Sequence, residues 1–311
     1  MTRTCHEPVP ARIPAPAARV VLIGAPSPLR SAVAQQLSAS NGLLACLDTP
    51  ARLCSPAVTS ANGLAGATVV FVTLPRLPGL AARLRYRYRD PALAAGFEQA
   101  VTTARHHRAA RVVVLSTAFR YDDDDGLTLH PGSPTLEAAE TAPAAAAERA
   151  ARLFTSLGGD SVVLRLGWTI GPEERITRRV LSAARRGWRL IDADPSAWVA
   201  MIAETDAARA VRPALTVPPG TYNVTDGHPV TQGMLNARLE TALGRPLHSL
   251  DELGWGADGI LFGPSRKSPT ARSMTSPDGS RRLPRPPRAW PACATCGRSR
   301  PVSAPPRRRE T

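Results

Sequence analysis

Arg19-Val-Val-Leu-Ile-Gly-Ala-Pro-Ser-Pro-Leu-Arg-Ser-Ala-Val-Ala-Gln-Gln-Leu37 is the stretch of sequence that decides the fold. It opens with four apolar residues, Val20 to Ile23, a run typical of a parallel strand that is buried on both faces. Gly24 then begins a turn. The stretch therefore predicts a central strand that ends in a tight turn.

A helix is expected directly after this turn. Ser27 stands at the N-cap position, and Pro28 stands at the first helical position, where a missing N–H is tolerated. Apolar residues recur behind them at helical spacing: Leu29, Val33 and Leu37. A strand that runs through a tight turn into a helix directs free backbone N–H groups and the positive end of the helix dipole at one point. Such a point is suited to binding phosphate.

The glycine pattern of a dinucleotide site is incomplete here. Such a site has three glycines, and only Gly24 is present. At the spacing G-x-x-G-x-x-G, Ser27 and Arg30 take the second and third positions. Serine is small enough to allow a phosphate nearby, and the Arg30 guanidinium can reach a pyrophosphate or a ribose phosphate. The hypothesis is that Gly24, Ser27, Pro28, Leu29 and Arg30 hold a pyrophosphate; the alternative is an ordinary β-α unit without a ligand.

Size and composition fit one large α/β domain with a small appendage. The chain has 311 residues, of which 43% are hydrophobic, and it contains no run of 18 uncharged apolar residues that could span a membrane. Residues 1–18 are rich in proline and alanine and have no apolar segment of the kind found in signal peptides. We expect them to form a disordered leader, and we expect the protein to be cytoplasmic.

The net charge of +14 is concentrated at the C-terminal end. Residues 264–311 hold eleven arginines and one lysine against two acidic residues, together with ten prolines. This segment is expected to be disordered. A basic tail can bind nucleic acid or an anionic membrane, but no aromatic residues alternate with its charges, so neither partner is expected.

No metal site is expected. Cys293 and Cys296 form a lone C-x-x-C without a second pair or nearby histidines. The run Asp122 to Asp125 is interpreted as a solvated loop, because four consecutive residues cannot converge on one ion.

An acidic residue ends the second predicted strand, residues 43–47. Asp48 lies 24 residues after Gly24, close to the position at which a carboxylate binds an adenosine ribose. It favours NAD, because it would repel a 2′-phosphate, whereas Arg30 or Arg52 would favour NADP. The choice between the two cofactors stays open, and a solvated Asp48 is the alternative.

Strands and helices alternate along the rest of the chain. Strands are predicted at 67–74 (closed by Pro75), at 110–115, within 161–172 (a strand and a turn) and at 220–224. Helices are predicted from Pro91 and at 134–157, 176–186, 198–211 and 231–243. Between Asp48 and Ala67 there is room for one helix but hardly for a further strand and helix. This alternation predicts an α/β fold with a doubly wound, Rossmann-like parallel sheet. Thr73, Leu74 and Pro75, at the end of one strand, are expected to line the cofactor cleft.

The order of these segments resembles the extended and atypical branches of the short-chain dehydrogenase/reductase superfamily, the group of NAD-dependent epimerases and dehydratases. Val20 to Ala25 looks like the family's first strand and glycine turn, and Val112 to Ala118, with Tyr121, looks like its active-site strand. Three later landmarks are 162–172, which looks like the strand that ends in Y-G-P, 207–211 and 221–224. The resemblance covers roughly residues 18–263.

The family's acid–base pair, Tyr-x-x-x-Lys, is absent. If Glu148 is the family's helix glutamate, the pair falls at Glu140 and Ala144, and neither residue can do its chemistry. The absence does not depend on this alignment, because the one lysine of the chain is Lys267 and no tyrosine lies between Tyr121 and Tyr222.

The resemblance implies an atypical NAD(P)-dependent oxidoreductase of ketoreductase type, which reduces a carbonyl of a small molecule such as an aromatic polyketide. Thr117 would then hydrogen-bond the substrate carbonyl, and Ser116 would take this role if the alignment is shifted by one residue. Tyr121 or water would donate the proton. His130 is a weaker candidate for proton transfer. Trp168, Thr169 and Ile170 would lie at the substrate end. The alternatives are a sugar-nucleotide epimerase or dehydratase and a non-catalytic NAD(P)-binding relic.

This interpretation divides the chain into a leader (1–18), a dinucleotide-binding domain (19–165), a smaller substrate-binding part (166–263) and the basic tail (264–311). The partners expected are a small-molecule substrate and, at most, a second copy of the chain in a homodimer. Membrane and nucleic acid are not among them.

Overall fold

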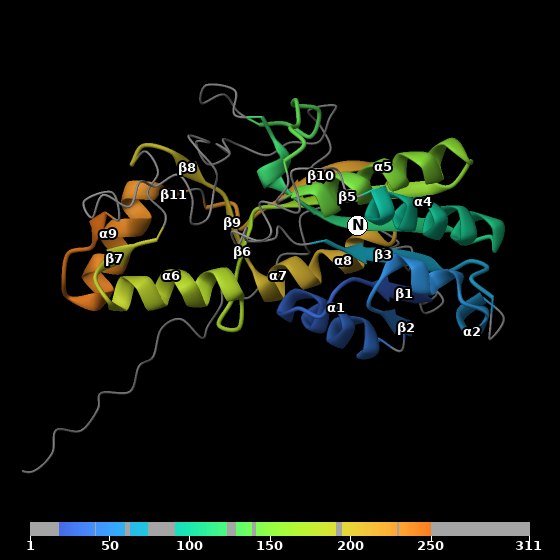
Figure 1. The fold of residues 1–311 in the computed structure, drawn as a ribbon, viewed down its shortest axis with the longest axis horizontal. Coiled ribbons are helices and arrows are strands. Elements are labelled where there is room, and N and C mark those ends of the chain that lie inside the picture. The colour runs from blue at the N-terminus through green and yellow to red at the C-terminus, as the bar shows by residue number, and fades with distance from the viewer. Residues whose placement is uncertain are drawn as a thin grey trace, which may run out of the picture.

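A six-stranded parallel sheet forms the centre of the molecule in the computed structural model (Figure 1). The structure describes residues 19–40, 42–59, 63–73, 91–122, 129–138, 141–190, 195–228 and 230–249. The sheet order is β10-β5-β4-β3-β1-β2, and every neighbouring pair is parallel. The strands are β1 (Val20–Ile23), β2 (Leu43–Leu47), β3 (Thr68–Val72), β4 (Arg111–Thr117), β5 (Asp160–Leu166) and β10 (Gly220–Val224).

Burial follows the position of each strand in this order. The inner strands β1 and β3 are buried at every residue, as expected for a parallel sheet with helices on both faces. The edge strand β2 alternates between half-buried and exposed residues. The uninterrupted apolar runs therefore mark the middle of the sheet, as the sequence predicted.

Helices cover both faces of the sheet. On one face lie α1 (Pro28–Ser38), α7 (Glu204–Arg209) and α8 (Val211–Ala214), and on the other lie α4 (Pro91–His106) and α5 (Ala142–Ser156). The rings of Phe71 on β3 and Phe97 on α4 meet edge to face, with centroids 5.2 Å apart. The doubly wound α/β fold expected from the sequence is confirmed.

A smaller part lies beside the sheet and contains α6 (Arg175–Arg185) and α9 (Gln232–Leu243) (Figure 1). Three two-stranded sheets accompany these helices. They pair β6 (Trp168–Ile170) with β9 (Met201–Ala203), β8 (Trp198–Val199) with β11 (Val230–Thr231), and β7 (Trp188–Arg189) with β12 (His248–Ser249). The chain leaves the large sheet after β5, returns to it at β10 and leaves it again toward β11, so it passes between the two parts more than once.

Two predicted helices have different bounds. The helix expected over 134–157 begins at Ala142, because Thr135 pairs with Tyr121 in a β-bridge and Pro143 stands in the first helical turn. The helix expected over 198–211 is helical from Glu204 onward. Its first half forms β8 and β9, because these residues find backbone partners in β11 and β6.

The short connection between the second and third strands is as expected. Residues 50–59 hold a 3₁₀ turn (Pro50–Cys54) and a single helical turn, α2 (Pro56–Thr59), and β2 is the edge of the sheet. Among the residues that the structure describes, no helix combines the length and the apolar character needed to cross a bilayer.

Gly24 allows the turn after β1 to lie against β3. A Cβ atom added to Gly24 would lie 2.6 Å from the carbonyl oxygen of Val72, and the Gly24 amide donates to the Leu47 carbonyl at 3.0 Å. The residue is therefore glycine because two strands approach it closely.

Substitution of Gly24 by alanine should destabilise the fold by about 1–3 kcal/mol, because the added methyl group would force backbone to move. The control is Gly96→Ala in α4, where nothing lies within 4 Å of the added Cβ; it should gain about 0.5–1 kcal/mol from helix propensity. Urea unfolding of both variants measures the difference. Equal stability of the two would contradict the close approach.

Candidate functional site

The start of α1 retains amides for a ligand although Ser27 caps part of it. Ser27 Oγ accepts from the Arg30 amide at 3.1 Å, and the Ser27 carbonyl accepts from the Ser31 amide at 3.0 Å. Within the described residues the amides of Ser27 and Leu29 have no acceptor. The Ser27–Pro28 N-terminus is thus as predicted, and two of its donors remain available to an anion.

Arg30 and Asp48, predicted to bind different parts of a cofactor, lie together. Arg30 Nη2 is 3.0 Å from Asp48 Oδ1 and donates to Cys46 Sγ at 3.0 Å. The Arg30 Nε atom is buried without a hydrogen-bond partner, whereas the Asp48 side chain is 48% exposed. The ion pair connects the first turn of α1 to the residue that follows β2.

Thr73 ties the end of β3 to β4. Its hydroxyl donates to the Leu115 carbonyl at 2.6 Å, and its amide donates to the same oxygen at 3.0 Å. The side chain is buried. Leu74 and Pro75, the other two residues predicted to line the cofactor cleft, lie outside the described residues.

Ser116 and Thr117 end β4 with their hydroxyls in different roles. Ser116 Oγ donates to Glu148 Oε1 at 2.5 Å, so its proton is already used. Thr117 Oγ1 accepts from the Phe119 amide at 3.3 Å. No acceptor for the Thr117 hydroxyl hydrogen lies among the described residues, which favours Thr117 over Ser116 as the ligand of a carbonyl oxygen.

Glu148 is the centre of a buried charged cluster. Arg165 donates from Nε to Oε1 at 3.2 Å and from Nη2 to Oε2 at 2.9 Å, and Arg120 forms an ion pair with Oε2 through Nη1. Burial raises the pKa of the Glu148 carboxyl, but the bonds and charges of Arg165, the charge of Arg120 and the Ser116 bond outweigh it and lower the pKa. Two guanidinium groups on one carboxylate leave the cluster with a net positive charge.

Tyr121 lies over the same cluster. Its hydroxyl donates to Asn223 Oδ1, and the Arg165 guanidinium stacks 4.7 Å from the ring centroid. Burial raises the pKa of the phenol, and the charge of Arg165 opposes this only in part. Tyr121 therefore stays protonated at neutral pH, with its proton directed at Asn223.

Sequence reasoning did not assign site roles to Glu148, Arg120, Arg165 or Asn223. A signal for three of them was present, because Arg120, Glu148 and Arg165 are charged residues within apolar or alanine-rich segments. Charges in such positions are almost always paired. Asn223 gave no comparable signal, since its partner Tyr121 is 102 residues away in the sequence.

The position aligned with the family's lysine is closed to that chemistry. Ala144 lies in the first turn of α5 and is 1% exposed. Glu140, aligned with the tyrosine, lies outside the described residues. Lysine is absent from the part of the chain that the structure describes.

Trp168, Thr169 and Ile170 form β6 between the large sheet and the smaller part. The Trp168 ring packs in a cluster of buried residues from the smaller part, and Phe119, just after β4, packs against the same cluster. The Trp168 indole nitrogen is buried without a hydrogen-bond partner. The predicted substrate end therefore adjoins the end of β4.

Two acidic residues lie near Gly171, the residue that follows this strand. Glu174, before α6, is buried, and its Oε1 has no hydrogen-bond partner among the described residues; the same holds for Glu204 Oε2 at the start of α7. Burial raises the pKa of Glu174, and the charge of Glu204 raises it further. Burial also raises the pKa of Glu204, followed by the charge of Glu173.

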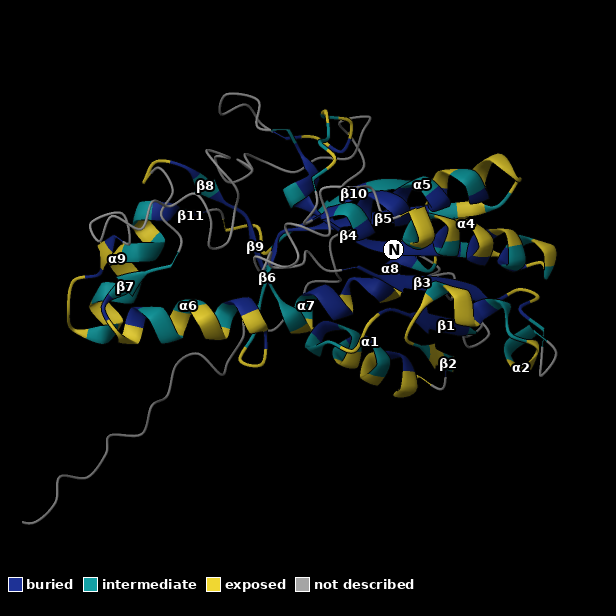
Figure 2. Cartoon of the chain, viewed as in Figure 1, coloured by how far each residue is buried: buried dark blue, intermediate teal, exposed yellow. Residues whose placement is uncertain are grey.

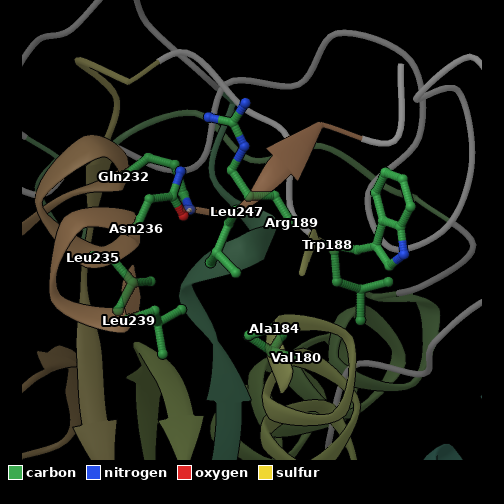
Figure 3. Close-up of a pocket in the computed structure, with 10 residues that line it drawn as sticks. Val180, Ala184, Trp188, Arg189, Gln232, Leu235, Asn236, Leu239 and Leu247 are labelled. Carbon is green, nitrogen blue, oxygen red and sulfur yellow. Dashed lines mark hydrogen bonds between the residues drawn. The ribbon is translucent and has the colours of Figure 1, made fainter. Parts of the chain in front are cut away.

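A small cavity in the smaller part contains none of the predicted site residues (Figure 3). Its volume of about 10 Å³ suits one water molecule. Gln232 Oε1 and Arg189 Nε line it, and both are buried without a hydrogen-bond partner. The remaining lining residues are Val180, Ala184, Trp188, Leu190, Leu235, Asn236, Leu239 and Leu247. A bridging water, rather than a substrate, fits this space.

The remaining candidates do not join the site. His130 is exposed. Cys46 and Cys54 are free thiols, and residues 123–128, which hold most of the acidic run, are outside the described residues, as are Cys293 and Cys296.

Fold and site together define a Rossmann-like protein with a polar end of β4 beside a helix N-terminus. No protein-family model matches the sequence, and no curated protein matches it. Solved structures do match. MoeE5 in complex with UDP-glucose and NAD is 19% identical, with a TM-score of 0.59 over 84% of this chain and 89% of that chain.

Two further matches are sugar-nucleotide enzymes with NAD. DesIV, a dTDP-glucose 4,6-dehydratase from Streptomyces venezuelae, is 16% identical, with a TM-score of 0.60 over 84% of this chain and 94% of that chain. The UDP-glucose 4-epimerase of Thermus thermophilus is 17% identical, with a TM-score of 0.57 over 83% and 90%. The chain therefore has the fold of the NAD-dependent epimerases and dehydratases, as the resemblance implied.

The two buried glutamates should respond to pH with opposite signs. The lowered pKa of Glu148 means that its carboxylate stabilises the fold above the ordinary value of 4.5 and that this stability is lost as the pH falls. Glu148→Gln should therefore cost about 3–5 kcal/mol near neutral pH, because it leaves two buried arginines without a counter-charge.

The stability contributed by Glu174 should depend on pH in the opposite direction. Its raised pKa means that its favourable contribution exists below 4.5 and is lost as the pH rises through the raised value. Glu174→Gln should therefore stabilise the protein near neutral pH, with a gain that shrinks in acid. Thermal unfolding across this pH range measures both variants, and a pH-independent effect in either would refute its assignment.

Proposed function

We propose that the protein is an atypical NAD(P)-dependent oxidoreductase, which transfers a hydride to a carbonyl carbon of a small molecule. The observation that carries the proposal is the Thr117 hydroxyl at the carboxyl end of β4, on the edge of the sheet to which the start of α1 also belongs. Open α/β sheets bind ligands at this edge. The fold shared with NAD-bound epimerases and dehydratases supports the same conclusion.

The residues at α1 fit a dinucleotide. The amides of Ser27 and Leu29 would hold the diphosphate, and the buried, unpartnered Arg30 Nε offers a further donor. Asp48 would accept from a ribose hydroxyl, although its ion pair with Arg30 must rearrange to admit a 2′-phosphate. Such a cofactor supplies or accepts the hydride when bound.

At the reacting end, Thr117 Oγ1 would donate its free hydroxyl hydrogen to the carbonyl oxygen. The net positive charge on Arg120, Arg165 and Glu148 would then favour the negative charge that develops on that oxygen. This charge takes the place of the missing lysine. The cluster also keeps Ser116 fixed, because its hydroxyl is bound to Glu148.

The proton has two sources in this proposal. Tyr121 retains its proton at neutral pH, but it must release Asn223 before it can give that proton to a substrate. Water is the second source. Neither resembles the Tyr-Lys pair, so the site suits carbonyl reduction, in which hydride transfer depends mainly on proximity and orientation.

A sugar-nucleotide epimerase or dehydratase is the second candidate function. Structures that match were solved with UDP-glucose, UDP-glucuronic acid or UDP-N-acetylmuramic acid. The absence of the Tyr-Lys pair opposes this candidate, because those reactions require more acid–base catalysis than hydride transfer alone.

Titration with NADH and NADPH, followed by nicotinamide fluorescence, tests the cofactor. We expect binding of at least one, and we expect Asp48→Asn to improve the affinity for NADPH relative to NADH by about tenfold, because a repelling charge is removed. Glu98→Gln, at an exposed position of α4, is the matched control and should change neither affinity. Binding of neither cofactor would leave the non-catalytic interpretation.

Kinetics of Thr117→Ala test the reacting end. We expect carbonyl reduction to slow by about a hundredfold through loss of the donor, with cofactor affinity unchanged. Ser116→Ala should act mainly on stability, because its hydroxyl serves Glu148. A Thr117→Ala enzyme with normal turnover would exclude the proposed role. UDP-glucose turnover by the wild type would instead favour the second candidate.

A further inference from the structure

Five arginines form one exposed face of α6. Arg175, Arg178, Arg179, Arg185 and Arg186 are all exposed, and Figure 2 shows the exposed segments of α6 along the outer side of the smaller part. Each residue turns the helix by about 100°, so these five side chains lie within about a third of its circumference. We call this surface the α6 arginine face.

The rest of α6 is used by the fold. Ile176, Val180 and Ala184 lie on the opposite side and pack into the smaller part, where α6 meets α9. Because the apolar side is already covered, α6 cannot lay it into a lipid bilayer as interfacial helices do. The arginine face is therefore a surface of a packed helix.

The charges on this face are poorly compensated. Among the described residues, the ion pair between Arg178 and Glu173 is the one contact that offsets them, at 3.6 Å between two highly exposed side chains. Such a pair is weak and screened by salt. Arg175, Arg178 and Arg179 are neighbours at spacings of three and four residues, where like charges destabilise a helix.

The position along the helix makes the arrangement less favourable still. Arg175 opens α6 at its N-terminal end, where the helix dipole opposes a positive charge, and the first turn of α6 has no acidic residue. The sequence thus breaks the local rules for a stable helix. Features of this kind are expected at functional sites, where another interaction compensates for them.

We propose that the α6 arginine face is a docking surface for an acidic α-helix of a partner protein. Its charges lie in two groups along one side of α6. Arg175, Arg178 and Arg179 stand in the first half of the helix, and Arg185 and Arg186 stand at its end. An acidic helix laid alongside α6 can face both groups. Leu181, 36% exposed, borders the face and gives it an apolar contact. A nucleic-acid backbone would not use this contact, and α6 offers no aromatic ring for stacking on bases.

The test uses the full-length protein and a fluorescent amphipathic peptide with glutamates on one face and leucines at its border. Arg179→Glu should weaken peptide binding by about tenfold. The same change should leave the thermal unfolding temperature equal or higher, because it removes repulsion and pairs with Arg175. Weaker peptide binding together with an unchanged or higher unfolding temperature would show that Arg179 serves docking and not the stability of the fold.

Arg152→Glu, at an exposed position of α5, is the matched control, because it changes the net charge of the protein by the same amount. It should leave peptide binding unchanged. Equal losses in both variants, a lower unfolding temperature in Arg179→Glu, or no binding of the peptide would overturn the proposal. The proposal would also be overturned if Arg179→Glu weakened binding to oligothymidine or to phosphatidylserine vesicles more than it weakened binding to the peptide.

Discussion

The arrangement of residues at the end of β4 depends on the ion pairs and hydrogen bonds of the buried Glu148 carboxylate. A buried charge is tolerated only when it is paired and hydrogen-bonded, and Glu148 meets this condition through Arg120, Arg165 and Ser116. These contacts join α5 to β4, β5 and the turn after β4 near the carboxyl ends of the strands. Thr117 is therefore held by neighbours whose positions are fixed by charge as well as by packing.

The same cluster explains how a site could work without the family's acid–base pair. Its net positive charge lies near the end of β4, and the Arg165 guanidinium also covers the Tyr121 ring. A lysine would bring a similar charge from α5, but the Lys position holds the buried Ala144. In the proposed site the positive charge comes from Arg165 on β5 and Arg120 in the turn after β4, and not from α5.

Most of the fold could be predicted from the sequence, because its main strands and helices follow from local patterns of apolar and capping residues. Residues only a few positions apart were enough to predict three features: the strand Val20 to Ile23, the Ser27–Pro28 cap and the short connection after Asp48. The start of α5 and the strands β8 and β9 could not be predicted, since they depend on partners such as Tyr121 and β11 that are distant in the chain. Local apolar pattern cannot distinguish a short buried strand from a helix there.

The site residues named from the sequence stay predictions, and their contacts could not be predicted from local patterns. Arg30 and Asp48 were assigned to a cofactor separately, and their ion pair came from the folded chain. A crystal structure of the protein grown with NADH tests the account most directly. It should show the diphosphate on the amides of Ser27 and Leu29, with the nicotinamide ring beside Thr117. A cofactor bound elsewhere, or with its nicotinamide away from the end of β4, would contradict the account.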